Sequence, residues 1–261
     1  MDNSGNWAQK PGFSGPPLSS DEKDKQNQAA GTPQPIFLLP TVVTALCGLL
    51  LAVHLATLVL DPIGQRELTL WFAYTPLRFL AGLESPAEWV PLIWTPFTHA
   101  FLHAGWEHLL INVAWLAIFA TPVARRYGAA PTVVIFLVGA AAGAAAFTAT
   151  SLYDGTFLVG ASGGVAALTG AAVRFIFQPV IMGRHPETGE PVPLGRKLAT
   201  LGEVFANPRS RWFTLIWIAL NAAVPLLPLL VGGGEMAIAW QAHLGGFAFG
   251  FFIVPLFERR P

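Results

Sequence analysis

The chain has 261 residues, of which 53% are hydrophobic and only 11% are charged, and its formal net charge is zero. With a mean hydropathy of +0.53, this composition excludes an ordinary soluble domain and indicates a chain that lies in a lipid bilayer. We therefore expect the bilayer as its surroundings, and no nucleic-acid partner.

Residues 1–35 differ in composition from the rest of the chain. They are rich in Ser, Asn, Gln, Pro and Gly, carry mixed charges, and contain neither a periodic apolar run nor a cleavable signal pattern. We predict a disordered cytoplasmic tail, followed by one membrane domain at residues 36–261.

From Ile36 onward the sequence contains six apolar segments, judged against the roughly 20 residues that a helix needs to cross a bilayer. Their approximate ranges are 36–60, 105–124, 131–152, 162–178, 212–231 and 236–257. The fourth segment is short and begins at Ser162. The pattern predicts an all-α membrane protein built as a bundle of six transmembrane helices.

Lys and Arg collect on the cytoplasmic side of membrane proteins, and this preference determines the predicted orientation. If the N-terminus is cytoplasmic, every basic residue except Arg66 and Arg78 also falls on the cytoplasmic side. Both termini are then cytoplasmic, and the second, fourth and sixth segments run inward from the outer side. We expect a multi-pass protein of the bacterial inner membrane.

Two loops between the segments differ in character. The outer loop, residues 61–104, is dense in aromatic residues, which are enriched at the level of lipid headgroups, so we expect it to be partly helical and embedded in the membrane. The inner loop from Gln178 to Arg211 is polar and suggests no chemistry. Cys47, the only cysteine, is expected to be an inert packing residue of the first segment.

Polar side chains inside spanning segments cost free energy, about 2.5–3.5 kcal/mol for a charged group at mid-bilayer, so each one needs a reason. His108, Asn112, Ser162 and His243 all lie toward the outer ends of the three inward-running segments. Because these residues are far apart in the chain, their similar depth indicates one shared site.

Residue spacing predicts how these side chains meet. His108 and Asn112 are four residues apart, so they project from one face of their helix. His243 shares a face with Gly246 and Gly250, and this GxxxG pattern permits close helix contact. Packing the fourth segment on the sixth would bring Ser162 Oγ within hydrogen-bond reach of His243, the geometry of a nucleophile and its general base.

Ser162 is surrounded by residues without bulk, in the stretch Val159-Gly160-Ala161-Ser162-Gly163-Gly164. A serine that attacks a peptide carbonyl needs such neighbours, because a Cβ atom would block the approach of the peptide backbone. A plainer interpretation makes Ser162 the N-cap of a Gly-rich helix. By the same reasoning His243 alone could be a polar clasp between helices, and His108 with Asn112 an interhelical hydrogen-bond pair.

A metal site is another alternative, formed by His99, His103 and either Glu107 or His108. The face that His99, His103 and Glu107 would share requires one continuous helix. We expect instead that the loop ends and the helix begins at Ala104-Gly105.

Two other polar residues are assigned no catalytic role. Asp154 lies in the loop before the serine, a position typical of a solvated residue rather than of a third triad member. His54, in the first segment, is expected to be packed or interfacial. We therefore predict a dyad of Ser162 and His243 that uses neither a metal nor a cofactor.

Four separated motifs resemble, in the same order, those of the rhomboid family of intramembrane serine proteases, over roughly residues 36–257. They are Trp94 followed by His99 and His103; His108-Leu109-Leu110-Ile111-Asn112; Gly160-Ala161-Ser162-Gly163; and Ala242-His243-Leu244-Gly245-Gly246. By this resemblance Ser162 is the nucleophile and His243 its base, and the oxyanion hole is formed by His108, Asn112 and the backbone N–H of Ser162. The site glycines are Gly160, Gly163 and Gly246. The resemblance also implies a six-helix bundle whose water-filled active site opens outward below the membrane surface.

Three positions depart from the commoner family pattern, although none of them removes a reacting group. Thr95 follows Trp94 where many relatives have arginine, and Ala124 precedes Arg126 where many have glutamate. Ala166 lies four residues after the serine, where many relatives place an aromatic ring that stacks on the histidine.

The resemblance implies an endopeptidase that cleaves transmembrane segments of other membrane proteins near their outer ends. The alternative is a proteolytically silent relative that binds membrane-protein clients; such relatives usually lack the serine or the histidine, and both are present here. A small-solute transporter would show repeats with matched broken helices, and the sequence has no such symmetry.

Overall fold

The computed structural model describes residues 39–185, 188–223 and 239–258. All of them fall within one structural unit, Leu39–Pro261. The predicted disordered tail, residues 1–35, lies outside the described residues, so it stays a prediction.

The six predicted segments correspond to six helices. They are α2 (Thr41–Leu58), α6 (Trp106–Tyr127), α7 (Ala129–Ser151), α8 (Ser162–Ile176), α10 (Pro208–Ala222) and α12 (Trp240–Ile253). Among the described residues, four helices are long and apolar enough to cross a membrane: α2, α6, α7, and α12 taken together with the 3-10 turn η4 (Val254–Phe257). The helix α8 is apolar but shorter, and α10 ends just before the undescribed residues 224–238. The all-α membrane fold is therefore confirmed, and six crossings are consistent with it.

The loop of residues 61–104 is largely helical, as predicted. It contains α3 (Pro62–Phe72), α4 (Leu77–Glu84), the 3-10 helix η1 (Pro86–Ile93), α5 (Thr95–Thr98) and the 3-10 turn η2 (His99–Phe101). The indole N–H of Trp94 donates to the carbonyl oxygen of Trp71 at 2.7 Å, and the two rings stack. Aromatic side chains therefore hold this loop together from within.

The segment between α8 and α10 has more structure than the plain polar loop that we expected. It forms an antiparallel hairpin of β1 (Val180–Arg184) and β2 (Pro191–Arg196), followed by α9 (Leu201–Ala206). The helix α10 then begins at Pro208 rather than near residue 212, because Asn207 caps it by accepting the N–H of Arg209.

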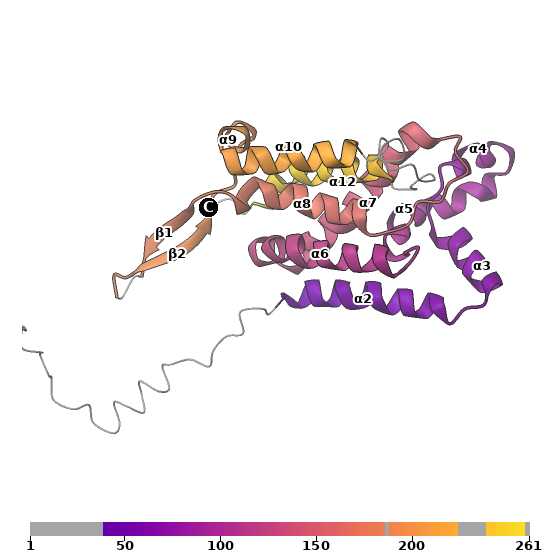
Figure 1. Cartoon of the computed structure of the whole chain (residues 1–261), viewed down its shortest axis with the longest axis horizontal. Helices are drawn as coiled ribbons and strands as arrows, with labels where there is room; N and C mark the ends of the chain where they lie inside the picture. The colour runs from indigo at the N-terminus through magenta and orange to yellow at the C-terminus, as the bar shows by residue number, and fades with distance from the viewer. Residues whose placement is uncertain (1–38, 186–187, 224–238, 259–261) are drawn as a thin grey trace, which may run out of the picture. The chain divides into compact units, whose positions relative to one another are not determined.

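The helix α8 forms the centre of the bundle. Every residue from Gly163 to Phe175 is buried, and Figure 1 shows α8 lying between α6 and α10. Small residues allow this, because helix backbones approach closely only where the side chains between them are small. A Cβ atom added at Gly250 would overlap the carbonyl oxygen of Ala167, and one at Gly170 would overlap that of Phe247.

The helices α8 and α12 run in the same direction. Gly163 on α8 meets Gly246 on α12, and Ala167 meets Gly250, one turn further along both helices. The fourth and sixth segments are therefore parallel neighbours, as their predicted topology required.

Candidate functional site

Backbone hydrogen bonds tie the chain ahead of Ser162 to the loop of residues 61–104. Leu158 and Tyr74 pair through both backbone groups, at 2.7 and 3.2 Å. The N–H of Gly160 donates to the carbonyl oxygen of His99 at 3.0 Å. The start of α8 is thus held from outside the helical bundle, by a segment far away in the sequence.

His99 and His103 serve this loop as neutral imidazoles. His99 Nδ1 donates to the carbonyl oxygen of Thr95 at 3.0 Å, and the N–H of Ala161 donates to His103 Nε2 at 3.4 Å. Burial lowers the pKa of His99 to about 4. Burial, and after it the positive charge that His108 can carry, lowers the pKa of His103 to about 4. Both residues are therefore uncharged near pH 7 and act as hydrogen-bonding groups for the backbone ahead of the serine.

Gly160 is required by its backbone conformation and by its surroundings. Its φ of 113° lies in the left-handed region that favours glycine. A Cβ atom there would lie 2.5 Å from Cε1 and 2.6 Å from Nε2 of His108. The imidazole of His108 is therefore packed directly on the backbone two residues before Ser162.

Ser162 is the first residue of α8 and is only partly buried. The N–H groups of Ser162, Gly163 and Gly164 have no acceptor among the described residues, because they occupy the first helical turn. Free N–H groups at a helix N-terminus attract negative charge. This end of α8 can therefore stabilise an anion.

The two glycines after the serine differ in how much room they have. At Gly163 an added Cβ would make ordinary contacts of 3.5–3.7 Å with Ala140 and Ala242. At Gly164 it would lie 2.5 Å from the carbonyl oxygen of Phe136. Close packing on α7 therefore explains Gly164, whereas Gly163 matters through its carbonyl group, which meets Gly246.

His243 lies at the same end of the bundle as Ser162. Gly163 follows the serine directly and touches Gly246, which is one turn after His243. Gly160, two residues before Ser162, likewise lies against His108, so the parts of the chain that carry His108, Ser162 and His243 are neighbours. In the described part of the chain, however, no hydrogen bond joins Ser162 Oγ to His243.

Asn221 is the neighbour of His243 that the sequence reasoning missed. His243 Nδ1 and Asn221 Oδ1, on α10, are 2.8 Å apart. Asn221 lies in the middle of the fifth predicted segment, residues 212–231, and near the end of α10. A single asparagine among apolar residues is the signal that could have pointed to it.

Asn112 is buried on α6, one turn after His108. One of its two amide N–H groups donates to the carbonyl oxygen of His108 at 2.8 Å. The second N–H has no partner among the described residues.

The residues to which we assigned no chemistry lie apart from this cluster or are packed. Asp154 is exposed, and its loop position agrees with the prediction. His54 is buried against the ring of Trp106, with the two ring centroids 4.8 Å apart. Cys47 is buried in α2.

The alternative metal site lacks the continuous helix that it requires. His99 belongs to η2, His103 lies in the following loop, and α6 begins only at Trp106. The described residues contain no group of three or more potential metal ligands.

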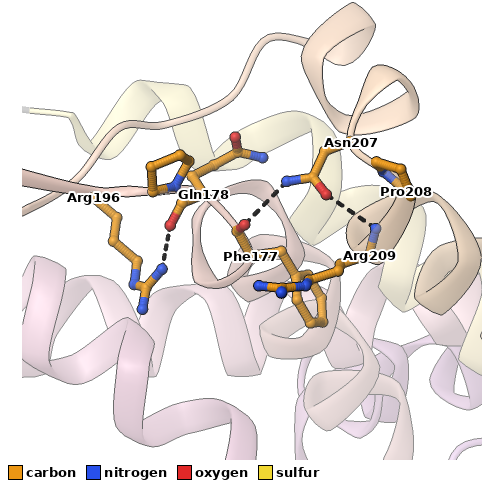
Figure 2. A pocket seen from close by; sticks show the side chains of 7 residues that line it. Phe177, Gln178, Arg196, Asn207, Pro208 and Arg209 are labelled. Atoms are coloured by element: carbon orange, nitrogen blue, oxygen red, sulfur yellow. Dashed lines mark hydrogen bonds between the residues drawn. The ribbon is translucent and has the colours of Figure 1, made fainter. Parts of the chain in front are cut away.

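A cavity of about 440 Å³ lies at the other end of α8, where that helix ends and α10 begins (Figure 2). It is lined by Phe177, Gln178, Pro179, Arg196, Asn207, Pro208 and Arg209. Asn207 donates to the carbonyl oxygen of Phe177 at 3.0 Å, and Arg196 donates to that of Gln178. The length of α8 places this cavity roughly 20 Å from Ser162, and its lining contains no nucleophile or base.

The fold and this cluster define a multi-pass helical membrane protein whose polar residues gather at the start of its most buried helix. The family model of the rhomboid domain matches residues 91–260, which is more than half of the chain, so the protein belongs to the rhomboid family. A search of curated proteins finds no match. The protein is therefore an integral membrane protein of a family of intramembrane proteases.

Proposed function

We propose that the protein is a serine endopeptidase that cleaves transmembrane segments within the bilayer. The observation that carries the proposal is the meeting of α6, α8 and α12 at one end of the bundle. There a serine with free neighbouring N–H groups lies beside one histidine, and a second histidine is supplied through the Gly163–Gly246 contact.

In the proposed reaction, His243 Nε2 accepts the proton of Ser162 Oγ while that oxygen attacks the carbonyl carbon of the scissile peptide bond. The protonated His243 then donates its proton to the leaving amine, which departs as the C–N bond breaks. Water hydrolyses the resulting acyl-enzyme, with His243 acting as base again. The missing hydrogen bond between Ser162 and His243 does not oppose this sequence, since catalytic hydrogen bonds often tighten only when substrate binds.

The negative charge that develops on the carbonyl oxygen is stabilised by the backbone N–H of Ser162, by the free amide N–H of Asn112, and by His108. Each well-placed donor contributes about 3–4 kcal/mol to lowering the barrier. The dipole of α8 adds to this effect, because the reacting carbonyl lies at the N-terminus of the helix.

The proposed substrates are other membrane proteins, which are cleaved near the outer end of a transmembrane helix. A helix hides its own carbonyl groups, so the cleaved segment should contain helix-destabilising residues after the scissile bond. The resemblance to the family adds small residues at the scissile site. The distribution of Lys and Arg supports cytoplasmic termini and an active site near the outer surface. The membrane that we propose is a bacterial inner membrane.

The test is cleavage of a model transmembrane substrate by the purified protein in vesicles. Ser162→Ala and His243→Ala should each abolish turnover without unfolding the protein, because groups that act as a unit lose most activity when either is removed. Asp154→Asn, at an exposed loop position, should keep near wild-type activity.

Two results would contradict the proposal. One is turnover by Ser162→Ala, which would place the nucleophile elsewhere. The other is a wild-type protein that binds the substrate and never cleaves it, which is the behaviour of a silent relative.

A further inference from the structure

The hydrogen bond between His243 and Asn221 has a definite direction. Asn221 Nδ2 donates to the carbonyl oxygen of Trp217, one turn earlier in α10, at 2.8 Å. Because a carbonyl oxygen only accepts, the amide nitrogen must face Trp217 and Oδ1 must face His243. The amide of Asn221 is therefore oriented by its own helix.

This orientation determines which nitrogen of His243 carries the proton. Oδ1 only accepts hydrogen bonds, so at 2.8 Å the Nδ1 of His243 must be the donor. In a neutral imidazole the other nitrogen, Nε2, then carries the lone pair. Nε2 is the atom that must accept the proton of Ser162 in the proposed reaction.

We propose that Asn221 is a positioning residue that holds His243 in the tautomer and ring orientation needed for a general base. This inference rests on the proposed protease function and extends its dyad to an ordered set of Ser162, His243 and Asn221. An asparagine has the same part in the Cys-His-Asn proteases, where an amide oxygen orients the histidine without carrying a charge.

Packing around the pair shows why the position is well defined. The ring of Trp217 stacks on that of Phe247, with centroids 4.5 Å apart, and Phe247 lies one turn after His243 on α12. This contact holds α10 against α12 one turn away from the pair of Asn221 and His243 on both helices. Ala166 has no aromatic ring that could stack on His243. The hydrogen bond to Asn221 Oδ1 is then the interaction that holds the imidazole in place.

The amide also favours the charged form that appears during the reaction. When His243 accepts the serine proton, the Nδ1–H···Oδ1 bond becomes a bond to a cation, and such bonds are about twice as strong as neutral ones. Loss of this bond should therefore slow the chemical step more than it weakens substrate binding.

The experiment compares Asn221→Ala, Asn221→Asp and Thr214→Val with wild type, as full chains in vesicles, on one model transmembrane substrate. Thr214 is the matched control, because it is buried on the same helix two turns earlier and its hydroxyl has no partner among the described residues. The quantities measured are kcat, KM, the pH–rate profile, the rate of fluorophosphonate labelling and the thermal midpoint.

Asn221→Ala should lower kcat and the labelling rate by about 10- to 100-fold, with KM changed less than about 3-fold. Asn221→Asp should recover most of the rate, and the acidic limb of its pH–rate profile should move to higher pH, since a carboxylate favours the protonated imidazole. A merely structural amide would give the reverse order, because a buried carboxylate is costlier than an alanine. Thr214→Val should match wild type.

The inference is overturned if Asn221→Ala keeps wild-type kcat, or if the aspartate variant is the less active of two folded variants. If Asn221→Ala does not fold, the pH–rate profile of Asn221→Asp decides, and an acidic limb at the wild-type position contradicts the inference. An unreactive wild type means that the proposed function itself has failed, whereas an active wild type with an unaffected alanine variant removes only the role of Asn221.

Discussion

Asn112 lies one turn beyond His108, with one amide N–H engaged and the other free. If that free N–H binds the oxyanion, Asn112→Ala should reduce kcat by about 100-fold, with a much smaller change in KM, because such a donor acts mainly in the transition state. Steady-state kinetics on a model substrate measure both constants. A change confined to KM would place Asn112 in substrate binding instead.

Ala166 occupies a space that is already full. It is 3% exposed and lies in one cluster with Phe247 and Phe251 of α12, against which Trp217 packs. Ala166→Tyr should therefore overpack this cluster and lower the free energy of unfolding by about 1–3 kcal/mol, rather than restore the ring that many relatives have. Thermal unfolding checks this prediction. An unchanged midpoint with full activity would show that the cluster can rearrange to accommodate a tyrosine.

The loop before Ser162 was predicted only in part from its residues. The pattern around Ser162 predicted glycines that clear space for a peptide, and the structure adds that Gly160 makes room for His108. The sequence pattern could not show that the carbonyl oxygen of His99 accepts the N–H of Gly160, because any residue type can form a backbone hydrogen bond to a distant segment.

At the scale of helices, the contact between α8 and α12 determines whether the serine and the histidine share a site. An added Cβ at Gly246 would overlap the carbonyl oxygen of Gly163. Gly246→Ala should push the helices apart, lower the free energy of unfolding by about 1–3 kcal/mol, and reduce activity.

The matched control for this substitution is Gly48→Ala in α2, where an added Cβ meets nothing within 4 Å. Alanine there should leave activity unchanged and raise stability by up to about 1 kcal/mol, because glycine is unfavourable in a helix interior. Equal effects of the two substitutions on thermal unfolding and activity would contradict the importance of the Gly163–Gly246 contact.

The loop of residues 61–104 should make stability depend on pH. Burial holds the pKa of His99 at about 4, below the ordinary value of 6.5. Between pH 6.5 and 4 the unfolded chain therefore binds more protons than the folded one, so stability is full above pH 6.5 and falls as the pH is lowered through this window. His103 acts in the same direction.

The measurement is the thermal midpoint at pH 7.5 and at pH 4.5, for wild type and for His99→Gln. Wild type should lose more stability than the variant on acidification, since glutamine binds no proton. Identical losses would show that other groups cause the acid sensitivity.

Across the whole molecule, the helical segments and their parallel neighbours followed from apolar length and small-residue spacing. Contacts between side chains that are far apart in the sequence did not follow from them. Arg126 pairs with Glu258 at 2.8 Å, and the hydroxyl of Tyr127 donates to the same carboxylate. The sequence showed only that Ala124 stands where many relatives have a glutamate. The pairing of Arg126 with Glu258, which is more than 100 residues away, depends on tertiary packing.

The position of Asn221 shows the same limit at the site. An asparagine inside an apolar segment carries a free-energy cost, but it names no partner, since pairing with His243 depends on how α10 packs against α12. The sequence therefore named Ser162, His108 and His243 as candidates, while the contact between Asn221 and His243 emerged only from the fold.

The most direct test of a serine protease site is covalent labelling of the purified wild-type protein with a fluorophosphonate, followed by peptide mass spectrometry. The prediction is a single adduct on Ser162, which is absent from Ser162→Ala and strongly reduced in His243→Ala. Absence of any adduct on the folded wild type, or an adduct on a different serine, would contradict the assignment of Ser162 as the nucleophile.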